Sequence, residues 1–149
     1  MKIGRIAASA VVTGVAASAV VTGVAPAYAD TFVDGLYSVI RSAGLAPAQH
    51  SGPADKMWAV SSCGPGCRQV VGDNNLTWQT HLVGGQWTGS THSQEAVDCK
   101  NGTWASGTLV LSVDPQTLRG TIVGSSDGPA CGSPTPITAG TVDLLLAYA

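Results

Sequence analysis

The chain has 149 residues, a formal net charge of −2 and only 11% charged residues. Its seven lysines and arginines are too few to neutralise a nucleic-acid backbone, so we do not expect a nucleic-acid partner. Nineteen glycines and abundant serine, threonine and valine favour short strands joined by tight turns over helices.

The N-terminal segment, residues 1–29, has the pattern of a secretory signal peptide. Lys2 and Arg5 precede a long run of small apolar residues, and the sequence at 27–29 is a small-x-small cleavage pattern. An uncleaved transmembrane anchor is the alternative, since the run is about long enough to span a bilayer. We expect cleavage, no stable membrane insertion afterwards, and a single secreted domain at 30–149.

Cleavage would change the charge of the protein. Five of the seven basic residues would remain against nine acidic ones, which gives the mature chain a net charge of −4. All four cysteines would lie in the exported part, where an oxidising environment favours disulfides.

The first segment of this domain, residues 31–43, is ambiguous between helix and strand. Its apolar residues recur at helical spacing, and Gly44 would suit a helix C-cap. Gly35 and the composition of residues 36–40 instead favour a strand. The residues themselves leave both interpretations open.

Residues 58–63 predict a strand with Trp58, Val60 and Ser62 on one face. The Gly64-Pro65-Gly66 sequence predicts a hairpin loop that places Cys63 opposite Cys67, within disulfide reach. We expect a structural disulfide here. A redox or metal-binding pair is the alternative, which the absence of a following helix disfavours.

The next segments continue as strands and turns. Residues 76–83 alternate well, Gly84-Gly85 predicts a two-residue hairpin turn, and Trp87 lies on the returning strand. The polar residues at 90–94 predict a loop, and residues 96–99 resume an extended structure.

Two further turns organise the second half of the chain. Asn101-Gly102 predicts a hairpin turn before a strand at 103–113. The Asp-Pro sequence at 114–115 predicts a type I turn before a strand at 118–123. The final strand, 142–148, is expected to direct four residues inward: Val142, Leu144, Leu146 and Tyr148.

Seven or eight such strands predict an all-β fold, an antiparallel meander that closes, or nearly closes, as a barrel or sandwich. An unclosed sheet would leave aggregation-prone edges. Cys99 and Cys131 remain to form a second disulfide, which would tie a middle strand to the last loop.

Residues 35–132 contain six short motifs whose order and spacing carry a resemblance. They are Gly35-Leu36-Tyr37, Trp58 with Ser61-Ser62-Cys63 and Gly66-Cys67, Val83 to Trp87, Val97-Asp98-Cys99, Leu118-Arg119-Gly120, and Ala130-Cys131-Gly132. Together they resemble the motifs of a family of small actinobacterial extracytoplasmic domains, which occur as stand-alone secreted proteins and as outer domains of receptor serine/threonine kinases. The resemblance implies a strand for the ambiguous first segment and brings no activity, because the family is functionally uncharacterised.

We predict no catalytic residue, metal or cofactor. Zinc would need thiolates from cysteines that are expected to be oxidised. His81 or His92 with Asp98 would suit a serine hydrolase, yet no Gly-x-Ser-x-Gly elbow is present. A carboxylate pair for glycoside cleavage would have to come from Glu95, Asp98 and Asp114.

Four tryptophans against a single phenylalanine are an unusual excess. They either fill the core or line a site for an apolar or glycan ligand; they are Trp58, Trp78, Trp87 and Trp104. The hypothesis is therefore a secreted, non-enzymatic module that binds an envelope ligand or a protein partner. A secreted hydrolase, or a protease inhibitor that uses the loop at 64–66, is the alternative.

Overall fold

A computed structural model describes residues 31–41 and 50–149, which contain ten β-strands and no helix. The predicted signal peptide therefore lies outside the described residues. The strands are β1 (Gly35–Arg41), β2 (His50–Ser51), β3 (Met57–Gly64), β4 (Cys67–Gly72), β5 (Thr77–Val83), β6 (Gln86–Asp98), β7 (Trp104–Val113), β8 (Arg119–Pro129), β9 (Pro136–Thr138) and β10 (Val142–Tyr148).

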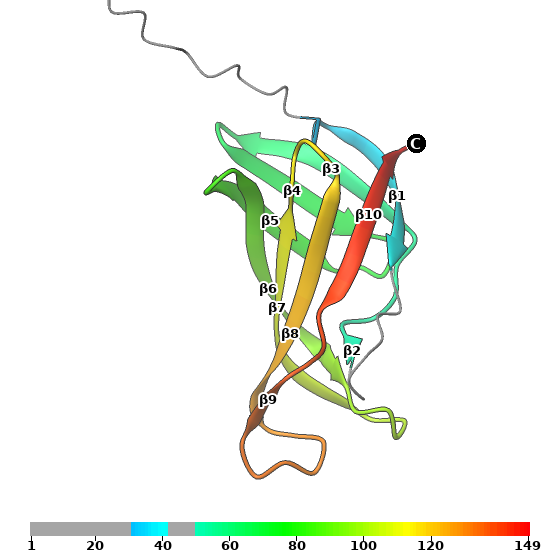
Figure 1. Ribbon diagram of the computed structural model, residues 1–149, viewed down its shortest axis with the longest axis vertical. Helices are drawn as coiled ribbons and strands as arrows, with labels where there is room; N and C mark the ends of the chain where they lie inside the picture. Colours follow the sequence, from blue (N-terminus) through cyan, green and yellow to red (C-terminus); the bar gives the residue numbers. More distant parts are fainter. Residues whose placement is uncertain (1–30, 42–49) are drawn as a thin grey trace, which may run out of the picture.

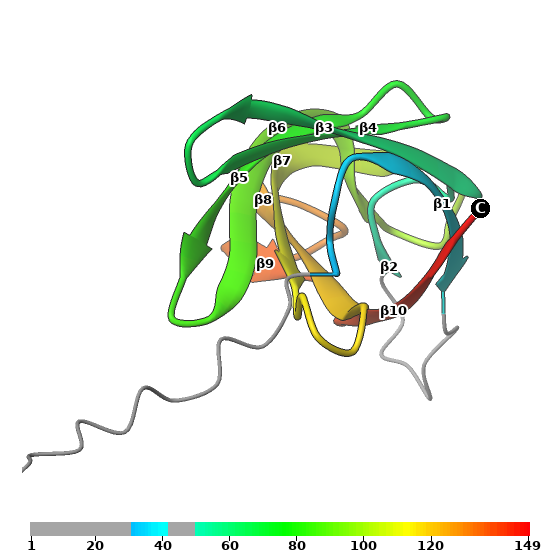
Figure 2. The same cartoon turned by 90° about the horizontal axis from the view of Figure 1, so that it is seen from above.

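Eight of these strands close into an antiparallel barrel (Figures 1 and 2). From β3 to β8 each strand pairs with the next along the chain. The barrel closes because β1 pairs with both β3 and β10, and β10 also pairs with β8. Two short strands lie outside this ring, with β2 on β6 and β9 on β8. The all-β prediction and the closed barrel are confirmed.

Both predicted disulfides are present, Cys63–Cys67 and Cys99–Cys131. The ambiguous first segment forms a strand from Gly35 to Arg41, as the resemblance implied. The Gly84-Gly85 turn has φ angles of 58° and 81°, a left-handed conformation that glycine adopts without strain.

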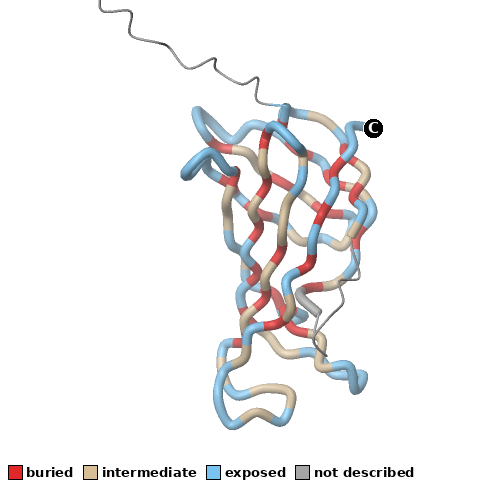
Figure 3. Tube along the Cα trace, in the orientation of Figure 1, coloured by how far each residue is buried: buried red, intermediate tan, exposed pale blue. Residues whose placement is uncertain are grey.

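Side chains fill the interior of the barrel. Buried residues recur at every second position over much of the barrel strands, as expected for a sheet with one face on a core (Figure 3). The largest fully buried side chains are Trp58, Trp78, Tyr37, Phe32, Leu109, Leu111 and Ile122. The barrel is therefore packed like a protein core rather than hollow like a ligand-carrying barrel.

Separate contacts close the two ends of the barrel. At the end that carries the C-terminus, here called the upper end, Phe32 is buried and its carbonyl accepts a hydrogen bond from Arg68 Nε at 3.2 Å. At the opposite, lower end, the Gly52 amide donates to the Ala96 carbonyl at 2.9 Å. A Cβ on Gly124 would lie 2.3 Å from the same carbonyl oxygen, so only glycine fits there.

Two local predictions were wrong. The expected loop at 90–94 is part of β6, which runs through it with a bulge between Ser93 and Val97. The inward positions of this stretch hold small residues because the neighbouring strand lies close: a Cβ on Gly89 would lie 2.2 Å from the Gln79 carbonyl oxygen. Without large apolar residues at alternate positions, the strand has no readable pattern.

Tyr148 is the second correction, because it was predicted to face inward and is 61% exposed. Its ring lies edge-on to the buried Tyr37, with ring centroids 5.3 Å apart. A Cβ on Gly35 would lie 2.5 Å from the Tyr148 ring, so a glycine at this position leaves the space that the ring occupies. The other three predicted inward residues of β10 are buried.

A buried carboxylate, Asp55, lies where β3 begins and was not anticipated. Its side chain is fully buried, and its Oδ1 lies 2.7 Å from both Nε and Nη2 of Arg41. Its Oδ2 accepts a hydrogen bond from the indole nitrogen of Trp58. One carboxylate thus joins the end of β1 to the start of β3 and to the aromatic core.

Trp58 and Trp78 form a natural matched pair for measuring that hydrogen bond. Both are fully buried, and their ring centroids lie 5.9 Å apart. Trp58 Nε1 donates to Asp55, whereas Trp78 Nε1 has no hydrogen-bond partner in the described part of the chain.

We therefore expect Trp58→Phe to lower the free energy of unfolding by about 1.5–3 kcal/mol more than Trp78→Phe, since only the first loses a bond to a charged group. Urea denaturation followed by circular dichroism would measure the difference. Equal losses would mean that the indole–carboxylate bond contributes nothing.

Candidate functional site

The structure separates the four predicted tryptophans into two groups. Trp58, Trp78 and Trp87 are buried in the barrel core. Trp104, the first residue of β7, is 38% exposed at the lower end. Of the four, only Trp104 is therefore placed to contact a ligand from solvent without rearrangement of the core.

Trp104 lines a groove that opens where β7 and β8 separate. The pairing of these strands ends at Gly107 and Ser126, and beyond that point the β6–β7 and β8–β9 hairpins diverge (Figure 1). The space between them has a volume of about 320 Å³ and is here called the lower groove. Its lining includes Cys99, Thr103, Trp104, Ser106, Ser126 and Cys131.

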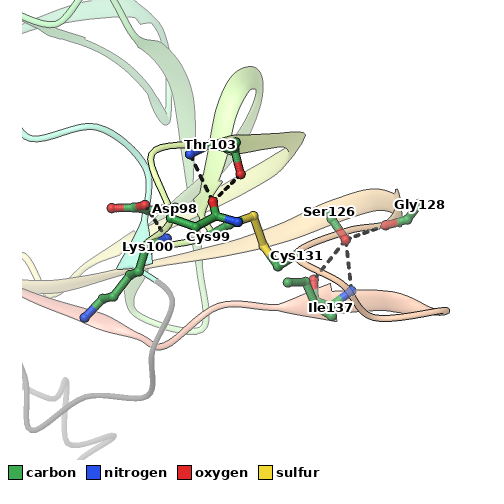
Figure 4. The surroundings of a disulfide bond; sticks show 9 residues. Asp98, Cys99, Lys100, Thr103, Ser126, Gly128, Cys131 and Ile137 are labelled. Carbon is green, nitrogen blue, oxygen red and sulfur yellow. Dashed lines mark hydrogen bonds between the residues drawn. A yellow bond between two sulfur atoms is a disulfide. The ribbon is translucent and has the colours of Figure 1, made fainter.

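The Cys99–Cys131 disulfide and a set of short hydrogen bonds brace this groove (Figure 4). The disulfide links the end of β6 to the segment after β8. On one side, the Cys99 amide donates to the Thr103 carbonyl at 3.0 Å. On the other side, Ser126 Oγ donates to the Gly128 carbonyl at 2.7 Å and accepts from the Ile137 amide at 2.9 Å. The groove therefore has walls that are fixed before any ligand arrives.

A second groove lies at the upper end of the same strands and is here called the upper groove. Its volume is about 530 Å³, and the Gly120 position forms part of its floor, where a Cβ would lie 2.5 Å from the Ser112 carbonyl oxygen. Donors and acceptors both line it. They include Gln86, Ser112, Asp114, Arg119, Thr121 and Asp143. Neither the residues of this groove nor their proximity was predicted, apart from Asp114 as a single candidate.

The predicted catalytic candidates His92, Asp98 and Asp114 do not come together. His92 Nε2 lies 2.6 Å from Asp127 Oδ2 rather than beside Asp98, and both side chains are about half exposed. Within the described residues, this is the only hydrogen bond of the His92 ring, so no serine hydroxyl completes a hydrolase arrangement. Asp98 pairs with Trp104 at the start of β7, whereas Asp114 follows the last residue of β7, so these two cannot act as a carboxylate pair on one glycosidic bond.

The described residues contain neither a candidate metal site nor a helix that could cross a membrane. All four cysteines are in disulfides, and no group of three or more histidine, cysteine, aspartate or glutamate side chains is placed to hold a metal ion. Residues 31–41 and 50–149 include no helix of the length and hydropathy needed to cross a membrane. No family model, curated protein or solved structure matches the chain.

Proposed function

We propose that this protein is a secreted, non-enzymatic binding module that holds a sugar ring against Trp104 in the lower groove. The two disulfides are consistent with an oxidising, extracellular environment. The predicted signal peptide at 1–29 supports the same location. The observation that carries the proposal is a partly exposed tryptophan, Trp104, on a groove whose walls are braced by a disulfide.

The composition of the groove favours a glycan over an apolar ligand. An indole ring offers a flat apolar surface to one face of a sugar, while hydroxyl and backbone groups around it can bond the sugar hydroxyls. Thr103 and Ser106 provide hydroxyls beside Trp104. Because the barrel interior is filled, an apolar ligand would find no equivalent shelter among the other tryptophans.

The placement of charged groups supports binding rather than catalysis. Two of the carboxylates that might have served as acid and base, Asp98 and Asp114, lie at opposite ends of β7, and the His92–Asp127 pair lacks a bonded nucleophile in the described residues. The exposed hairpin loop at 64–66 keeps a protease inhibitor as the alternative, which a panel of secreted proteases would detect.

Trp104→Ala should weaken sugar binding by roughly tenfold or more, since it removes both the stacking surface and the area buried by the ligand. Isothermal titration calorimetry of the full domain with chitobiose and with cellobiose would measure the loss of affinity. Ile40→Ala is the control, because Ile40 is an apolar residue that is 59% exposed on β1 and lies outside the groove. Wild-type protein that binds neither disaccharide, or equal losses in the two variants, would reject the proposal.

A further inference from the structure

The two grooves lie at opposite ends of one continuous surface. Trp104 of the lower groove and Ser112 of the upper groove are both on β7. Both side chains point outward, since three of the alternate residues between them, Gly107, Leu109 and Leu111, are buried. Ser112 lies eight positions after Trp104, which corresponds to about 27 Å at ~3.4 Å per residue. A ligand that filled both grooves would therefore be an extended chain.

The outer face between the grooves is formed by β6, β7 and β8 in exact register. Three cross-strand rows cover it, and they are Thr88–Ser112–Thr121, Ser90–Val110–Val123 and His92–Thr108–Ser125. Seven of these nine residues are polar and none carries a carboxylate or a lysine or arginine side chain. Within one row, the Thr88 and Ser112 hydroxyls lie 3.4 Å apart, so the face presents hydroxyl groups that can both donate and accept hydrogen bonds.

We infer that an extended neutral polysaccharide lies along this face, with one part against Trp104 and a later part in the upper groove beside Arg119. This inference rests on the proposed function and adds two properties of the ligand, its chemical class and its orientation along β7. A polyanion is disfavoured, because residues 30–149 carry a net charge of −4 and two aspartates, Asp114 and Asp143, line the upper groove. Arg119 and these carboxylates can instead donate to and accept from sugar hydroxyls.

An extended peptide fits this face less well. Peptides that add to sheets bond to an unpaired strand edge. Between the two grooves, β7 is paired with β6 on one side and with β8 on the other, so its edges are occupied. What remains for a ligand is the side-chain surface, which is rich in hydroxyls.

Chain length is the direct test. On the wild-type domain we would compare chitobiose with chitohexaose and cellobiose with cellohexaose by calorimetry, so that the two series distinguish acetamido from purely hydroxyl chains. At least one hexamer should bind roughly tenfold or more tightly than its dimer, because it reaches the second groove.

Two variants test whether the longer sugar extends along this face into the upper groove. Thr108→Glu places a charge midway along the face, and Arg119→Ala removes a contact in the upper groove. Both should lose most of the hexamer's advantage and leave dimer affinity unchanged. Ser61→Glu is the matched control, because Ser61 is exposed on β3, which lies across the barrel from β7, and it should change neither affinity.

The outcomes separate this inference from the proposed function. Equal affinity for dimer and hexamer, or an undiminished hexamer advantage in both variants, would overturn the extended site while leaving the Trp104 site intact. A wild-type domain that binds no sugar of either length would overturn both. Binding of an unstructured peptide that Thr108→Glu abolishes, without any sugar binding, would replace the glycan with a peptide.

Discussion

Replacing Asp55 with alanine is expected to lower the free energy of unfolding by about 3–5 kcal/mol, the range for breaking a buried ion pair by removing one partner. Asp55 is 6% exposed, and its carboxylate contacts the guanidinium of Arg41 and the indole nitrogen of Trp58. The substitution leaves two buried donors without this acceptor. Urea denaturation with a circular dichroism readout would measure the loss.

Asp34→Ala is the control for this prediction. Asp34 also pairs with an arginine, Arg68, but at 3.6 Å and with a side chain that is 58% exposed. Such a surface pair contributes about 0–1 kcal/mol, so the control should be nearly neutral. Similar losses for the two aspartates would show that burial of Asp55 adds nothing to its contribution.

Removing the Cys99–Cys131 disulfide should cost more stability than removing Cys63–Cys67. The first closes a loop with a sequence separation of 32 and the second a loop with a separation of 4. In the chain-entropy model these are worth about 3.7 and about 1.9 kcal/mol. Paired serine variants, Cys99→Ser/Cys131→Ser and Cys63→Ser/Cys67→Ser, would give the comparison by thermal and urea unfolding.

The two disulfide variants also test whether the Cys99–Cys131 disulfide holds the walls of the lower groove in place. Only the Cys99–Cys131 disulfide borders it, so its removal should also weaken sugar binding, by loosening the two walls before the ligand arrives. The Cys63–Cys67 variant should bind as the wild type does. Greater destabilisation from the shorter loop would contradict the stability prediction, and unchanged affinity without Cys99–Cys131 would contradict the bracing role.

Much of the barrel could be predicted because its strands bury one face. Leu109, Leu111 and Val113 alternate with exposed residues, and the turn at 84–85 carries the glycines its geometry requires. Both disulfides followed from the hairpin loop at 64–66 and from the number of cysteines left over. Local rules were sufficient wherever a strand carried large apolar side chains at every second position.

Other features depended on contacts between distant segments and were not predicted. The middle of β6 was missed because its inward side chains are small. The short strand β9 was missed because it begins at a proline and another proline lies two residues before it. The Arg41–Asp55 pair joins residues 14 apart, and nothing local marks an aspartate for burial. The sequence named Trp104 only as one of four tryptophans, since its exposure arises where β7 and β8 separate.

Collisional quenching of tryptophan fluorescence by iodide tests the central claim most directly, namely that one tryptophan meets both solvent and ligand while a filled barrel shields the others. Iodide is charged and does not enter a packed core. We predict a quenchable component that disappears in Trp104→Phe and that the hexasaccharide bound by the domain, chitohexaose or cellohexaose, protects at saturation in the wild type. A quenchable component that persists in Trp104→Phe, or that the sugar leaves unchanged, would contradict this account.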